Sequence, residues 1–144
     1  MSLPLYAVKK EGRGRIFCGP FCMVAITGEP YPKVRSAINA SRGRNPSAAV
    51  MGTSHRTLRE AFQRLGWHMW NTHEYGKNEG PTLAAWLRSG LRDKAHYCLV
   101  ELTHHWVLIA GMRFVDTYTK QPVALSEAPW RRAKVHRVFA VYKD

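Results

Sequence analysis

The sequence predicts an α+β domain in which N-terminal helices pack on a C-terminal antiparallel sheet. Apolar residues recur at three- and four-residue spacing in the first 90 residues, which indicates amphipathic helices. After Gly90 the pattern changes to β-rich runs separated by tight turns. The 144 residues suit one hydrophobic core, and we find no repeat or long linker, so residues 1–144 are expected to form a single domain.

The first helix is expected to begin at Gly19-Pro20, because a proline in the first helical turn loses no hydrogen bond. Its apolar run covers residues 20–27, and Gly28 is suited to end it. A second short helix is expected over residues 31–39.

The clearest helical pattern is GTSHRTLREAFQRLGW, residues 52–67. Thr53 or Ser54 is suited to cap its N-terminus, and Gly66 to end it. A fourth helix is expected over about residues 81–89, where a Pro-Thr pair precedes apolar residues that share one face.

Four β-rich runs follow Gly90, at residues 96–102, 105–110, 113–118 and 134–143. Gly111-Met112 is expected to form the tight turn between the second and third runs. Such a turn places residue 105 near residue 118 and residue 107 near residue 116. The side chains of His105 and Asp116 then lie on neighbouring strands, two residues out of register, where they reach one another diagonally.

The chain carries 22 Lys and Arg residues against 10 Asp and Glu, a net charge of +12. This excess favours nucleic acid, other polyanions or acidic peptides as partners. No apolar run approaches the roughly 20 residues that span a membrane, and the first residues, MSLPLYAVKK, do not resemble a signal peptide. We therefore expect no membrane association and a cytoplasmic location.

A candidate nucleophile lies in the stretch CGPFC, residues 18–22. A cysteine at a helix N-terminus is close to the positive end of the helix dipole, which lowers the pKa of its thiol. Cys18 occupies this position. A nucleophile of this kind also needs a base and a group that orients the base, and His105 with Asp116 supplies both.

The ordered set of Cys-Gly-Pro at a helix start, LREAFQRLGW, His-Trp-Val-Leu and Val-Asp-Thr resembles the papain-like cysteine peptidases. Within them it is most similar to the bacteriocin-leader-processing (double-glycine) peptidases, over roughly residues 12–118. The resemblance implies a papain-like fold that cleaves a peptide or amide bond, or transfers the acyl group. It implies that Cys18 is the nucleophile, His105 the base and Asp116 its orienting group. It also implies a peptide substrate with small residues at the cleavage point.

The sequence departs from the papain-like pattern at the oxyanion hole. Papain-like enzymes usually place a glutamine about six residues before the nucleophile, and here that position is Gly12. Arg13 and Arg15 are the candidates to replace it, together with backbone N–H groups. Gly19 and Trp106, which adjoin the nucleophile and the base, are further candidates for contacts with the substrate.

Several alternatives stay open from the sequence. Cys18 as an inert buried thiol is one, because free cysteines are among the most buried residues. A catalytically silent papain-like module that binds nucleic acid or an acidic protein is another, favoured by the missing glutamine and the net charge. A zinc site lacks a second tight pair of ligands, so we predict neither metal nor cofactor.

We predict no catalytic role for the other two cysteines, Cys22 and Cys98, or for His104, which precedes His105. Cys22 and Cys98 lie in apolar surroundings and are expected in the core, and all three thiols are expected to be reduced. His104 points to the opposite face of any strand that includes His105, so we expect His104 to face solvent.

Overall fold

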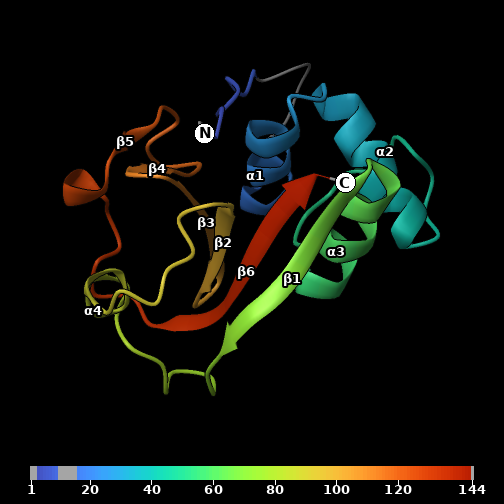
Figure 1. Cartoon of the computed structure of the whole chain (residues 1–144). Coiled ribbons are helices and arrows are strands. Elements are labelled where there is room, and N and C mark those ends of the chain that lie inside the picture. The colour runs from blue at the N-terminus through green and yellow to red at the C-terminus, as the bar shows by residue number, and fades with distance from the viewer. Residues whose placement is uncertain (1–2, 10–15, 144) are drawn as a thin grey trace.

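The computed structural model describes residues 3–9 and 16–143, and it has the predicted α+β architecture. A single antiparallel sheet runs through the middle of the molecule, with helices on both faces (Figure 1). In the described residues its six strands, in their order across the sheet, are β1 (Trp67–Glu74), β6 (Val135–Lys143), β2 (Tyr97–Leu102), β3 (His105–Ala110), β4 (Arg113–Val115) and β5 (Val123–Ala124).

Three helices, α1 (Cys18–Thr27), α2 (Tyr31–Ser41) and α3 (His55–Arg64), cover one face of the sheet. Eight of the ten residues of α1 are buried, so this helix is enclosed by its neighbours rather than amphipathic. It ends at Gly28, as predicted. The φ of +71° at that residue is a left-handed conformation that glycine adopts without strain.

The cap of α3 is Ser54, one of the two residues that the sequence offered. Its hydroxyl oxygen accepts a hydrogen bond from the N–H of Thr57 at 3.3 Å, which satisfies one of the unpaired donors of the first turn. The buried stripe of α3 then packs on α2 and on strand β1.

The fourth helix, α4 (Leu83–Arg88), lies on the opposite face of the sheet (Figure 1). Trp86 anchors it there against Cys98 and Val138. The expectation that the helices precede the sheet is therefore only partly right, because β1 comes before α4 in the chain. No helix within residues 3–9 and 16–143 combines the length and apolar character needed to cross a bilayer.

Strand β1 is absent from the sequence-based prediction. It is an edge strand, and Met69 is its only fully buried residue, so its sequence WHMWNTHE shows little of the alternation that identifies a strand. The short strand β5 and the 3₁₀ helix η1 (Leu125–Glu127) were also unpredicted, because both are too short to carry a periodic pattern.

The hairpin of β3 and β4 has the predicted register. Ala110 pairs with Arg113 and Leu108 with Val115 around the turn at Gly111 and Met112. Strand β4 is shorter than the predicted run, which continued to residue 118. It ends at Val115 because the next residue, Asp116, starts a turn that its own side chain stabilises.

We predict that Asn39→Ala lowers the free energy of unfolding by about 1–3 kcal/mol. Asn39 is fully buried, and its side-chain N–H groups donate to the carbonyls of Pro46 (3.1 Å) and Ala48 (2.8 Å), which hold the loop between α2 and α3. Urea unfolding measures the effect, with the exposed Gln63→Ala as control. An equal, small loss in both variants would refute this role for Asn39.

Candidate active site

Cys18 is the first residue of α1, and it is partly buried. The residue before it, Phe17, is extended, and no side chain caps the N-terminus of this helix. Pro20 has no N–H, and the N–H of Phe21 donates to the carbonyl of Phe17 at 2.9 Å, so the N–H groups of Cys18 and Gly19 are the first-turn donors near the thiol. Their partial positive charge favours the thiolate. The backbone N–H groups of Gly19 and Trp106 favour the thiolate and lower the pKa of the Cys18 thiol.

His105 is the first residue of β3, where a two-residue turn, Thr103-His104, brings the chain back from β2. His104 has a φ of +59° in this turn and is exposed, as predicted. The Nε2–H of His105 donates to Oδ2 of Asp116 at 2.8 Å. Because Nε2 is occupied in this way, Nδ1 is the ring nitrogen left to hydrogen-bond with the Cys18 thiol.

The carboxylate of Asp116 is fully buried and is satisfied by four donors. Oδ1 accepts the backbone N–H groups of Tyr118 (3.0 Å) and Thr119 (2.8 Å). Oδ2 accepts the imidazole of His105 (2.8 Å) and the indole N–H of Trp130 (2.6 Å). A buried carboxylate with this many hydrogen bonds remains ionised and fixed in position.

Trp130 is the functional residue that the sequence analysis missed. Its indole lies beside the imidazole of His105, with ring centroids 5.2 Å apart, while its N–H reaches Asp116. Its φ of +66° is unusual for a residue with a bulky side chain, and a backbone held in such a conformation is often found at functional sites. No sequence pattern reports a positive φ at tryptophan, so this contact was not predictable.

The pKa of the Cys18 thiol is lowered, although burial alone would raise it. The hydrogen bond and charge of His105, with the N–H groups of Trp106 and Gly19, outweigh the burial because they favour the thiolate. Burial also disfavours the charged form of His105, but its hydrogen bonds to Asp116 and Cys18 raise its pKa to about 9.

The pKa of Asp116 is lowered as well. Its burial is opposed by the hydrogen bonds from His105, from the Thr119 N–H and from Trp130. The three shifts agree in direction, because they favour a thiolate on Cys18, a protonated imidazole on His105 and an ionised carboxylate on Asp116. This is the electrostatic state that a cysteine nucleophile requires.

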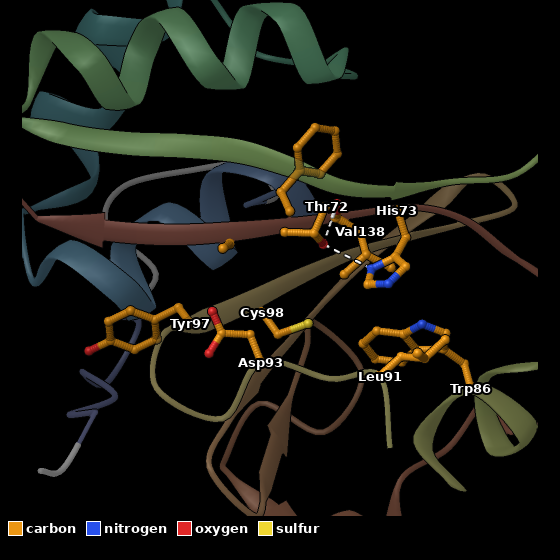
Figure 2. A pocket seen from close by; sticks show the side chains of 10 residues that line it. Thr72, His73, Trp86, Leu91, Asp93, Tyr97, Cys98 and Val138 are labelled. Atoms are coloured by element: carbon orange, nitrogen blue, oxygen red, sulfur yellow. Dashed lines mark hydrogen bonds between the residues drawn. The ribbon is translucent and has the colours of Figure 1, made fainter. Parts of the chain in front are cut away.

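The other two thiols have the opposite electrostatic environment. Cys22, one helical turn after Cys18, is fully buried, and burial raises the pKa of its thiol. Cys98 lines a pocket of about 160 Å³ on the α4 face of the sheet, beside Trp86 (Figure 2). Burial raises the pKa of Cys98 to about 12. Both thiols are protonated at neutral pH, which leaves Cys18 as the reactive one.

Comparison of the chain with models of protein families finds no match, and comparison with curated proteins finds none. The functional interpretation therefore rests on the site itself, and above all on the contact of His105 with both Cys18 and Asp116.

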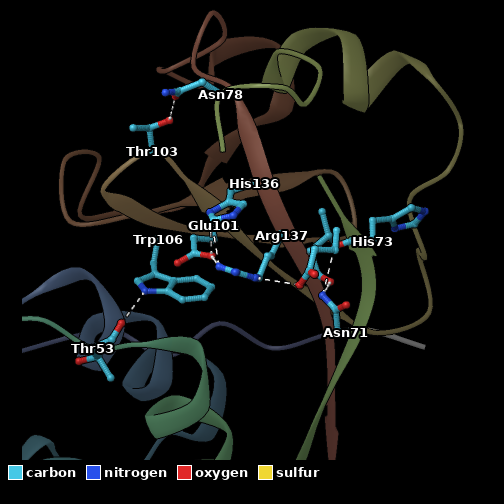
Figure 3. A network of polar contacts seen from close by, with 11 residues as sticks. Thr53, Asn71, His73, Asn78, Glu101, Thr103, Trp106, His136 and Arg137 are labelled. Carbon is cyan, nitrogen blue, oxygen red and sulfur yellow. Dashed lines mark hydrogen bonds and ion pairs between the residues drawn. The ribbon is translucent and has the colours of Figure 1, made fainter. Parts of the chain in front are cut away.

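The structure does not place the other four predicted site residues as exposed side chains around Cys18. Arg13 and Arg15 lie outside the described residues. Gly19 is buried, and a Cβ at its position would come within 3.1 Å of the side chain of Thr53, so the glycine allows α1 to pack closely there. The indole of Trp106 is buried and donates to the carbonyl oxygen of Thr53 at 3.1 Å (Figure 3). Trp106 therefore acts on Cys18 through its backbone N–H, and its buried ring is not exposed to contact a substrate.

A polar network lies next to Trp106 on the sheet (Figure 3). Arg137 donates to the carboxylates of Glu101 (2.8 Å) and Glu74 (2.9 Å), so the two carboxylates share one guanidinium. Within the described part of the chain, no group of three or more His, Cys, Asp or Glu side chains is arranged to hold a metal ion.

We predict that Trp130→Phe lowers the free energy of unfolding by about 1–3 kcal/mol at pH 7. The variant keeps an aromatic ring beside His105 but removes one donor from the buried Asp116 carboxylate. Because the folded-state pKa of Asp116 is lowered, this stabilisation is fully present above the unfolded value of about 3.8 and is lost as the pH falls from there through the lower folded-state pKa.

Urea unfolding from pH 7 down to pH 3 measures the effect, and Trp70→Phe is the matched control. Trp70 is 60% exposed and contacts the guanidinium of Arg59 rather than a carboxylate. A loss in Trp130→Phe that equals the loss in Trp70→Phe, or that does not shrink in acid, would contradict the assigned hydrogen bond.

Proposed function

We propose that this chain is a papain-like thiol hydrolase or acyl transferase that acts on a peptide or amide bond. The observation that carries the proposal is the position of His105, which contacts the Cys18 thiol on one side and the buried Asp116 carboxylate on the other. The α+β architecture, with the nucleophile on a helix and the base on an antiparallel sheet, supports a papain-like fold.

In the proposed mechanism the Cys18 thiolate attacks the carbonyl carbon of the substrate and forms a tetrahedral oxyanion. The imidazolium of His105 donates its proton to the leaving nitrogen, the C–N bond breaks, and a thioester remains on Cys18. Neutral His105 then takes a proton from water, which attacks the thioester and releases a carboxylic acid. An amine in place of this water gives acyl transfer. Asp116 holds the imidazole in orientation throughout.

The oxyanion needs hydrogen-bond donors, and the usual glutamine is missing from this sequence. We assign this role to the backbone N–H of Cys18 at the start of α1, because no side chain caps this helix. The loss of one oxyanion donor typically lowers a rate by about 10²–10³-fold. We therefore expect slow turnover compared with an enzyme that has a glutamine.

The substrate we propose is a peptide with small residues at the cleavage point, as the resemblance to the leader-processing peptidases implies. The net charge of +12 favours acidic residues near that point.

We predict that the chain cleaves members of a peptide pool that contains small-small pairs within acidic flanks. Mass spectrometry detects both the products and the acyl adduct on Cys18. Cys18→Ala should lose at least 10³-fold of the cleavage rate, because it removes the nucleophile. The matched control is Cys22→Ala, one helical turn away, whose thiol is buried and protonated, and it should retain activity.

Two results would contradict the proposed function. One is cleavage that persists in Cys18→Ala, which would place the chemistry elsewhere. The other is the absence of products and adduct across the pool while Cys18 alkylates as a free thiol, which would mean that the three groups do not act together.

A further inference from the structure

Half of the net charge of the chain belongs to one contiguous part of the sequence. Residues 30–70 contain seven Lys or Arg residues and a single acidic residue, Glu60, a net charge of +6 out of +12. This part forms α2, α3 and the start of β1, and the two helices pack side by side (Figure 1). The helical layer that covers α1 therefore carries a strongly positive outer surface.

We call this surface the α2–α3 arginine surface, and it consists of Arg42, Arg44, Arg56, Arg59, Arg64 and Trp70. Among the described residues, no carboxylate lies within ion-pair distance of any of these arginines. By contrast, the acidic side chains of the neighbouring sheet, Glu74 and Glu101, are already paired with Arg137. The described residues therefore provide no ion pair to these arginines.

Two arginines of the surface are ordered at the end of α2. Arg42 donates to the carbonyl oxygen of Gly52, and the Nε–H of Arg64 donates to the hydroxyl of Ser41 at 3.2 Å. Burial, together with the charge of nearby Arg44, lowers the pKa of Arg42. Guanidinium groups gathered in this way, with donors left over, fit the paired oxygens of phosphate groups.

An exposed aromatic ring lies beside one arginine of this surface, Arg59. Trp70, on the edge strand β1, is 60% exposed, and the guanidinium of Arg59 lies 5.9 Å from its ring centroid. The exposed indole does not belong to the hydrophobic core. The preceding residue, Met69, is the one that packs into the core. A tryptophan next to arginines provides a face on which an unpaired base stacks while the arginines contact the backbone phosphates.

We propose that the α2–α3 arginine surface binds single-stranded nucleic acid. An acidic peptide would satisfy the arginines but would leave the exposed indole unused, and a duplex does not present base faces to it. The binding is a property of the surface, independent of the Cys18 chemistry.

The test is a fluorescence-anisotropy titration of the full chain with a labelled, mixed-sequence 20-nucleotide single strand, at 50 and 200 mM NaCl. Arg56→Gln/Arg59→Gln is expected to bind at least tenfold more weakly at 50 mM. Its slope of log K against log salt should be shallower by about 1.4, because each phosphate contact on a single strand contributes about 0.7. Trp70→Leu is expected to weaken binding at least fivefold through lost stacking.

The matched control is Arg88→Gln/Arg132→Gln, which removes the same charge from two exposed arginines on the α4 side. It should change the affinity less than threefold. Circular dichroism identifies any variant that fails to fold, and Arg44→Gln/Arg56→Gln then replaces the affected pair.

The proposal is overturned if the wild-type chain does not bind at 50 mM, or if the control loses as much affinity as the surface variant. It is also overturned if Trp70→Leu binds normally, or if a duplex or a polyglutamate peptide binds as tightly as the single strand.

Discussion

The burial of one ionised carboxylate is the constraint on which the rest of the site depends. Asp116 is fully buried, so each of its lone pairs must be matched, and four donors from three segments of the chain converge on it. This requirement ends β4, shapes the turn that follows, and fixes Trp130 and the imidazole of His105. The electrostatic state of the Cys18 thiol then follows from the position of that imidazole.

Close packing around Gly19 is a second constraint, because it holds the N-terminus of α1 next to strand β3. The N-terminus of α1 approaches the segment before α3 so closely that a Cβ at residue 19 would lie 3.1 Å from the side chain of Thr53. The same Thr53 accepts the indole N–H of Trp106 from the sheet. Helix, loop and strand therefore meet at one tightly packed point, and the thiol and imidazole lie directly beside it.

The features that depend on local patterns were predictable from the sequence. The α+β class, the helix that starts at CGPFC, the cap of α3 and the register of the β3–β4 hairpin all follow from spacing and turn residues. The register in turn predicted that His105 and Asp116 touch, which the structure confirms.

The features that depend on long-range contacts were not predictable. Strand β1 has a weak pattern because it lies at the sheet edge, and Trp130 reaches Asp116 through a left-handed backbone conformation that no pattern signals. Trp106 looked like a contact for substrate because it follows His105, yet the alternation of the strand turns its ring into the core.

The most direct test of the account is the pH dependence of iodoacetamide labelling, with the modified cysteine mapped by mass spectrometry. A free thiol has a pKa of about 8.5. We predict that Cys18 in the wild-type chain reacts well below that pH and in preference to Cys22 and Cys98, and that His105→Ala loses this advantage. If Cys18 instead titrates as an ordinary thiol in both proteins, the thiolate–imidazolium pair does not form and the central claim is wrong.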